Sequence, residues 1–281
     1  MTARFRRFAA ALLALAAIAL PARAGSLTVD FTDLWWNDPD GSENGWGVNV
    51  VQQSDTLFLT FFVYGTDGAA RWVVASGMVP TAQQPAVGAR FEGDVFQTQG
   101  PWFGGPFDPA KVKVDKVGIA TITFDSASTA TLSYSVSGTA VVKRIKRQGF
   151  RVNSVAGVYA GGILATASQC TAAADNGPIN FWGTTTVTQT ASQMALKLDF
   201  YIPTGQLMTC TFTGTPELQG RLAAVSGGTM ACVIGNTTYN AGTFALSALD
   251  SQMNGFHATF TGKDQYCTYN GRFGGTRFPG T

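Results

Sequence analysis

Residues 194–201 of this 281-residue chain have the sequence MALKLDFY, in which every second side chain is apolar. Residues 129–136 (TATLSYSV) and 256–261 (FHATFT) show the same alternation, with serine, threonine or histidine between the apolar positions. Successive side chains of a β-strand point to opposite faces, so this period of two predicts strands with one buried and one solvated face. Turn signals such as Asp-Gly and Gly-Asn separate these runs at short intervals. The sequence therefore predicts an all-β protein, an antiparallel meander that forms barrels or sandwiches.

Residues 56–63 (TLFLTFFV) depart from this alternation, because apolar side chains occupy both sets of positions. Such a run predicts a strand that is covered on both faces. Across the chain, 45% of residues are hydrophobic and only 13% are charged, compared with about 25% charged residues in typical globular domains. The chain thus carries enough apolar material for a core and is not an intrinsically disordered polymer.

The first 24 residues predict an export signal. Arginines at positions 4, 6 and 7 precede an apolar run at 8–20, and Ala22-Arg23-Ala24 provides a small-x-small cleavage site before Gly25. The run has 13 residues, whereas a membrane-spanning helix needs about 20. No later segment is long and apolar enough to form such a helix. We therefore expect a periplasmic or secreted protein with no integral membrane segment after signal removal. An outer-membrane barrel is a weaker alternative, because four cysteines are unusual in that class.

Charge excludes some classes of partner. Without the first 24 residues, the chain has 15 basic and 17 acidic residues. Nucleic-acid-binding proteins carry dense basic patches, so we expect no nucleic-acid partner. The basic run at 143–147 (KRIKR) would place its charges on both faces of a strand, which favours a solvated strand end.

The four cysteines Cys170, Cys210, Cys232 and Cys267 all lie in the last 112 residues of the chain. An even number of cysteines in an exported protein indicates disulfides, and the spacing resembles no zinc site. Three pairings are possible, and we favour Cys210–Cys232 and Cys170–Cys267. The first pair joins apolar faces of strands that are close in a meander, and the second would lie where a barrel closes.

A change of composition near Arg151 predicts two all-β units. Residues 25–151 hold five of the six tryptophans and 22 charged residues, whereas residues 152–281 hold every cysteine and 10 charged residues. Each half has the size of an ordinary domain. We therefore expect a Trp-rich domain at 25–151 and a disulfide-containing domain at 152–281, with one continuous barrel or sandwich as the alternative.

The best candidate binding locus lies near the start of the first unit. Its sequence DLWWN (33–37) is followed by ENGWGVN (43–49). The adjacent indoles of Trp35 and Trp36 must point to opposite faces of a strand, and an uncovered indole usually has a partner or ligand. The glycines on either side of Trp46 permit close approach of a backbone. The predicted ligand-binding residues are Trp35, Trp36, Asn37, Glu43, Trp46 and Asn49.

This D-x-WW-N…E-x-GWG-V-N pattern resembles a recurrent β-domain of secreted proteobacterial proteins. The last third of the chain (C-T-F-T-G…G-G-T-M-A-C…G-R-F-G-G-T-R) is similar to a companion cysteine-containing β region of such proteins. The resemblance covers most of the sequence after residue 24. It implies no chemistry, so it assigns no catalytic residue. Here the segment 38–42 (DPDGS) is an insertion relative to the family pattern.

We expect an exported binding or surface-interaction module rather than an enzyme, with no cofactor and no metal. Its ligand would be a small apolar or sugar-like molecule or a protein partner. The alternatives are an extracellular hydrolase, with His257 in a triad or Asp33 and Glu43 as paired carboxylates, and a structural or adhesive protein without a small-molecule site. Asp38, Asp40, Ser42 and Glu43 suit a calcium loop in type but not in spacing, which favours an acidic turn.

Overall fold

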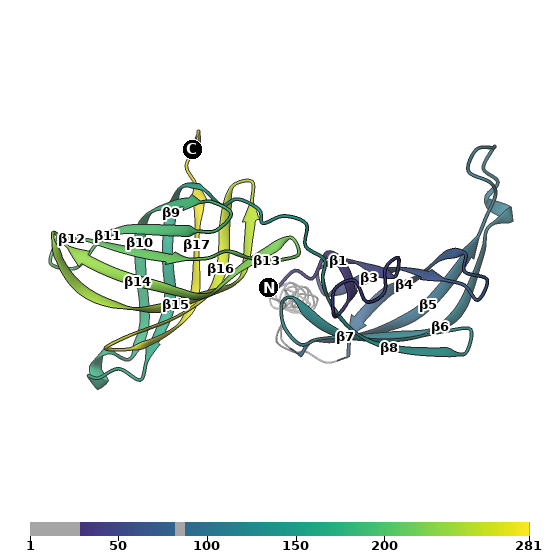
Figure 1. The fold of residues 1–281 in the computed structure, drawn as a ribbon, viewed down its shortest axis with the longest axis horizontal. Helices are drawn as coiled ribbons and strands as arrows, with labels where there is room; N and C mark the ends of the chain where they lie inside the picture. The colour runs from purple at the N-terminus through teal and green to yellow at the C-terminus, as the bar shows by residue number, and fades with distance from the viewer. Residues whose placement is uncertain (1–28, 82–87, 281) are drawn as a thin grey trace, which may run out of the picture.

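The computed structural model describes residues 29–81 and 88–280, so the predicted signal at 1–24 lies outside the described residues. The described residues form two antiparallel β-barrels that follow one another along the longest axis of the molecule (Figure 1). The prediction of an all-β chain with two units is confirmed, and barrels are the architecture observed. No helix within the described ranges is long and apolar enough to cross a bilayer.

The first barrel closes through eight strands in sequence order, with β8 pairing back onto β1. The strands are β1 Asp33–Asn37, β2 Gly47–Gln53, β3 Thr56–Tyr64, β4 Ala70–Pro80, β5 Arg90–Gln99, β6 Lys113–Phe124, β7 Thr129–Val136 and β8 Thr139–Arg147, with a 3-10 helix η2 at Pro109–Lys111. The predicted alternating strand at 129–136 coincides with β7. Inward-facing aromatic and aliphatic side chains fill this barrel.

The prediction that residues 56–63 are covered on both faces is wrong. On β3, Leu57, Leu59 and Phe61 are buried, whereas Phe58 and Phe62 are 40% and 44% exposed. A closed barrel covers only the inner face of each strand, so the outer face of β3 stays partly exposed. The first barrel therefore carries aromatic side chains on its surface.

The second barrel contains β9 Gly157–Ser168, β10 Gly177–Gln189, β11 Met194–Tyr201, β12 Leu207–Gly214, β13 Glu217–Gln219, β14 Leu222–Ile234, β15 Thr237–Gln252, β16 Gly255–Asp264 and β17 Thr268–Arg277, with a 3-10 helix η3 at Ala173–Asp175. The stretch MALKLDFY forms β11, and its apolar positions are buried. Pairing of β9 with β17 and of β12 with β14 closes the ring. The short β13 pairs only with β14 and lies outside the ring.

Two disulfides lie at the ladders that close this ring, and they are the pairs favoured by the sequence. Cys210 and Cys232 are directly opposite each other on β12 and β14. Cys170 and Cys267 join the β9–β10 loop to the β16–β17 turn, beside the β9–β17 ladder. Loop-closure entropy gives upper estimates of about 3 and about 4.7 kcal/mol for the stabilisation by the two bonds. Two disulfides fit an extracellular or periplasmic protein.

Asp33, the first residue of β1, holds the two barrels together. Its Oδ2 accepts hydrogen bonds from Nη1 of Arg147 at 2.9 Å and from the backbone N of Arg221 at 2.7 Å. Arg221 precedes β14, and its guanidinium also donates to the carboxylates of Asp30 at 2.8 Å and Asp250 at 3.0 Å. Burial lowers the pKa of Arg147, and the hydrogen bond to Asp33 opposes this shift. We call these five residues the inter-barrel ion cluster.

Candidate functional site

The second barrel encloses a cavity of about 650 Å³ at the end that points away from the first barrel (Figure 1). Inward-facing side chains of six strands form its walls, because a barrel interior receives every second side chain. These walls are apolar and consist of Ile163, Ala167, Ile179, Phe181, Leu198, Phe200, Met208, Cys210, Phe212, Met230, Cys232 and Phe260. Small-molecule sites are typically apolar clefts of about 300–1,000 Å³ with a few polar groups, and barrel mouths are common places for them.

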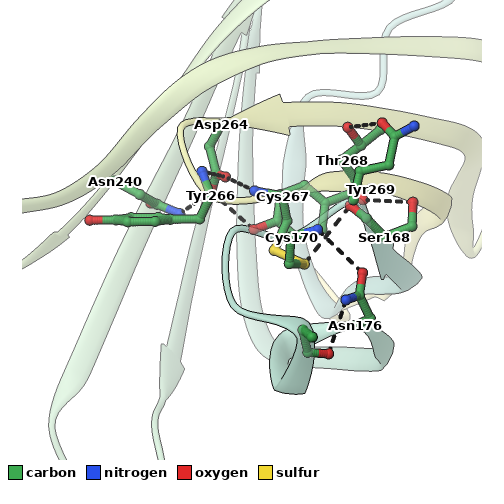
Figure 2. Close-up of a disulfide and its surroundings, with 11 residues drawn as sticks. Ser168, Cys170, Asn176, Asn240, Asp264, Tyr266, Cys267, Thr268 and Tyr269 are labelled. Atoms are coloured by element: carbon green, nitrogen blue, oxygen red, sulfur yellow. Dashed lines mark hydrogen bonds between the residues drawn. A yellow bond between two sulfur atoms is a disulfide. The ribbon is translucent and has the colours of Figure 1, made fainter.

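Asp264 organises the polar rim of this cavity (Figure 2). Its Oδ2 accepts a hydrogen bond from Nδ2 of Asn240 at 2.7 Å and another from the hydroxyl of Tyr269 at 2.9 Å. Its Oδ1 accepts from the backbone N atoms of Tyr266 and Cys267, both at 2.8 Å. Asp264 is only 7% exposed, and these four hydrogen bonds compensate for the burial of its carboxylate. One carboxylate thereby fixes side chains from β15 and β17 and the turn before β17.

The β9–β10 loop is held against the same rim. The Cys170–Cys267 disulfide connects the loop to the β16–β17 turn, and the backbone N of Thr171 donates to the carbonyl of Tyr266 at 2.8 Å. Within the loop, the side-chain oxygen of Asn176 accepts from the backbone N of Cys170 at 3.2 Å (Figure 2). The disulfide and these hydrogen bonds connect the loop and the turn that form the mouth. The cavity is therefore preformed.

The electrostatics of the mouth are acidic. Burial, followed by the hydrogen bond to Asp264 and the negative charges of Asp264 and Asp175, raises the pKa of Tyr269. Tyr269 therefore stays protonated and donates to Asp264. Asp175, Tyr239 and Asn240 complete the rim, and none of the described side chains lining the cavity is cationic. An anionic group on a ligand would find no counter-charge here.

The tryptophans of the predicted binding locus lie in the first barrel and have three different surroundings. Trp35 is 1% exposed, donates from Nε1 to the carbonyl of Phe31 at 3.1 Å and packs edge-on against Phe124. The Arg147 guanidinium lies 5.1 Å from its ring centroid. Trp35 therefore belongs to the core. Trp36 lies on the outer face of β1, as the alternation of a strand requires.

Trp46 precedes β2 and packs, partly buried, against the core of the first barrel. Its Nε1 donates to the hydroxyl of Tyr134 at 3.0 Å, and Nζ of Lys143 lies 4.9 Å from its ring centroid. Lys143 also binds the carboxylate of Glu43, which lies in the β1–β2 loop. Burial raises the pKa of Tyr134, so its hydroxyl remains protonated. The remaining predicted polar residue of this loop region, Asn37, donates to Oγ of Ser42 at 2.9 Å.

Five of the six predicted residues nevertheless line one shallow cavity of about 310 Å³: Trp35, Trp36, Glu43, Trp46 and Asn49. Nε1 of Trp36 and Oδ1 of Asn49 are shielded from solvent and have no hydrogen-bond partner within the described part of the chain. A buried donor and a buried acceptor without partners are rare in folded proteins. This feature keeps Trp36 and Asn49 as candidates for ligand contact.

The residues proposed for hydrolysis are placed unfavourably for it. Asp250 is opposite His257 on the β15–β16 ladder, but its carboxylate is bound by Arg221. Among the described residues, no hydrogen bond joins His257 to a serine or an aspartate. Asp33 begins β1 and belongs to the inter-barrel ion cluster, whereas Glu43 lies in the loop beyond the other end of β1. No triad and no carboxylate pair forms from these groups.

The two lysines of the basic run pair with the acidic loop 38–43. Lys146 lies 3.8 Å from Asp38 and also contacts Asp40, and the lysine at the start of the run binds Glu43. Arg144 lies 3.9 Å from Asp125, which is in the turn between β6 and β7. Within residues 29–81 and 88–280, no group of three or more His, Cys, Asp or Glu side chains could hold a metal ion. The loop is thus an acidic turn bound to β8.

Sequence reasoning missed the cavity and its rim residues Asn240, Asp264 and Tyr269. One signal was available, because Asp264 and Tyr269 flank Cys267, a cysteine already expected where the barrel closes. Asn240 lies in the 16-residue strand β15 and nothing in its spacing distinguishes it.

Comparison with protein-family models, with curated proteins and with solved structures finds no match to this chain.

Proposed function

We propose that the protein binds a small, mainly apolar molecule in the cavity of the second barrel. The observation that supports this function is the preformed apolar cavity of about 650 Å³, held open at its mouth by a disulfide and by the hydrogen bonds of Asp264. Eight-stranded barrels have an interior just large enough for side chains or for one small ligand. Here the side chains fill the end near the first barrel, and the far end is left open to a ligand.

The rim defines the polar end of this ligand. Asp175 lines the mouth, and Asp264 lies directly behind Asn240 and Tyr269. A carboxylate or phosphate on the ligand would meet two negative charges without a compensating cation, and a desolvated like-charge contact is unfavourable. A hydroxyl, amide or amine can donate to these oxygens or to the tyrosine hydroxyls. The ligand class is therefore an apolar molecule with a neutral or cationic hydrogen-bonding end.

Binding of the neutral fluorophore N-phenyl-1-naphthylamine tests the cavity directly. Ile179 points into the cavity from β10, whereas the next residue, Asn180, is exposed on the outer face. Ile179→Trp should fill the mouth and weaken probe binding by about tenfold or more. Asn180→Trp adds the same side chain outside the barrel and should leave binding unchanged. A wild-type protein that does not bind the probe, or equal binding by both variants with unchanged melting temperatures, would contradict the proposal.

A displacement series tests the ligand class. 1-Decanol and 1-decylamine should displace the probe at lower concentration than decanoate, because only decanoate brings a negative charge to the acidic rim. The opposite order would show that the polar end is assigned wrongly, even if the probe does bind in the cavity.

The outer face of the first barrel supports a second candidate function, carbohydrate binding at Trp36. Trp36 and Asn49 line one shallow cavity, and the Nε1 of Trp36 and Oδ1 of Asn49, which are shielded from solvent and unpartnered, would become a donor and an acceptor for a ligand if the two side chains turned outward. A sugar hydroxyl donates and accepts, so it matches this pair while the sugar ring stacks on an indole. Binding to an array of soluble glycans that is lost in Trp36→Ala would support this candidate.

A further inference from the structure

The hairpin of β5 and β6 projects beyond the rest of the first barrel, at the end opposite the second barrel (Figure 1). The β5–β6 ladder continues to Gln99 opposite Lys113. Pairing of β5 with β4 ends earlier, at Phe96, and pairing of β6 with β7 begins only at Ala120. The last part of the hairpin is thus a two-stranded ribbon that ends in the loop 100–112.

The tip of this ribbon is aromatic and carries no charge. Residues 100–107 read GPWFGGPF and include no ionisable side chain. Trp102, Phe103 and Phe107 are 72%, 95% and 69% exposed. Exposed apolar groups gathered in one place mark an interaction surface, whereas single exposed side chains do not.

The exposure of these rings is fixed by the local structure. The backbone N of Gly105 donates to the carbonyl of Trp102 at 3.2 Å, which closes a turn at the tip. The indole lies directly over Gly104, because a Cβ at this glycine would meet ring atoms at 2.4 Å. The centroid of the Phe103 ring lies 5.9 Å from that of Trp102. The turn and the ring contacts therefore order the tip locally, while its three rings stay exposed to solvent.

Charges of both signs stand behind the tip in equal number. From Asp94 to Lys116 the ribbon has three aspartates and three lysines. Lys116 lies 2.7 Å from Asp94, and Lys111 lies 3.7 Å from Asp108. A layer of zwitterionic lipid headgroups likewise presents phosphate and ammonium groups together. An excess of lysine, which anionic membranes attract, is absent from this described segment.

We infer that this aromatic tip is an insertion loop for a zwitterionic lipid surface. Trp and Phe concentrate at the boundary between headgroups and acyl chains, where interfacial anchors are buried by about 5–10 Å. A convex tip without ionised groups can enter this boundary with little desolvation of charge, and the balanced lysines and aspartates then lie among the headgroups. This inference goes beyond the proposed ligand cavity, which lies at the other end of the molecule.

Flotation with phosphatidylcholine vesicles tests the insertion loop. The full exported protein should float with these vesicles, and 0.5 M NaCl should not release it, because salt screens charges but not apolar insertion. The triple variant Trp102→Ser, Phe103→Ser, Phe107→Ser should partition at least about tenfold less. The matched control is Trp182→Ser, since Trp182 is 65% exposed on the second barrel, and its partitioning should equal that of the wild type. Phe103→Ser alone should give an intermediate loss without affecting the fold.

Several results would overturn the inference. They are a wild-type protein that stays with the unbound fraction, a triple variant that floats as well as the wild type, and binding that requires anionic lipid and disappears in salt. A wild-type dimer that dissociates in the triple variant, without any flotation, would identify a second copy of the chain as the occupant of the tip. The variant Ile179→Trp should float normally, which separates this test from that of the cavity.

Discussion

At the scale of single residues, the neighbours Trp35 and Trp36 should respond in opposite ways to truncation. Trp35 is buried in the first core, so Trp35→Ala should lower the free energy of unfolding by about 3–5 kcal/mol. Trp36 lies on the outer face, so Trp36→Ala should cost only about 1 kcal/mol. Chemical denaturation of both variants measures the difference. Equal, large losses would show that Trp36 is a packing residue and would end its candidacy for ligand contact.

The sequence predicts the direction of these side chains but not their surroundings. Period two requires that Trp35 and Trp36 face opposite ways, and it leaves open which of them enters the core. The same limit applies to Phe58 and Phe62, whose apolar character suggested a covered face although they are exposed. Whether an outer face is covered depends on segments far away in the chain, which local periodicity does not report.

At the scale of elements, strands were predictable where alternation is strict, and the cavity was not. The stretch MALKLDFY and β11 have the same bounds. Cys210 was correctly expected on the apolar face of a strand, and it shares that face of β12 with Met208 and Phe212. The same face serves both as core and as cavity wall. The cavity forms because the inward-facing side chains do not fill one end of the closed second barrel. Closure is a property of all eight strands together.

The rim of the cavity predicts how stability depends on pH. The pKa of Tyr269 is raised above its ordinary value of 10.0 in the folded protein. As the pH rises, this tyrosine therefore loses its proton in the unfolded chain before it does so in the folded protein. The stabilisation is complete below about pH 10 and declines as pH rises towards the pKa of the folded state. Tyr269→Phe removes this titration, so its melting temperature should fall less steeply between about pH 9 and about pH 11.5.

An exposed tyrosine provides the control for this measurement, and two other buried tyrosines also contribute to the loss of stability at high pH. Tyr201 is 76% exposed, so Tyr201→Phe should leave the decline as it is in the wild type. Burial also raises the pKa of Tyr134 and of Tyr159, and a residual decline should therefore persist in Tyr269→Phe. An unchanged slope in Tyr269→Phe would show that the rim hydroxyl does not stay protonated by contact with Asp264.

At the scale of the whole molecule, Arg221 should control how the barrels are held. It binds Asp30 and Asp33 of the first barrel region and Asp250 of the second. Arg221→Ala leaves Asp250 buried without a cationic partner, which should cost about 1–3 kcal/mol in the second barrel. It should also increase the radius of gyration measured by small-angle X-ray scattering, because the contact to the first barrel is weakened. Arg144→Ala, on an exposed pair, should change neither quantity.

Closure of both barrels also limits edge-to-edge strand pairing between copies of this chain. A strand with an unpaired backbone edge can template addition of a foreign strand, which is the first step of fibril growth. In the described residues such edges include β13, which is three residues long, the projecting ribbon of β5 and β6, the start of β10, where residues 177–183 pair only with β9, and the start of β8, where residues 139–144 pair only with β7. The ribbon edge carries Lys113, Asp115 and Lys116, and charges at an edge oppose further pairing. Ring closure thus leaves a chain that is poor in charge with short edges in place of whole edge strands, which limits the positions where a strand of another copy could add.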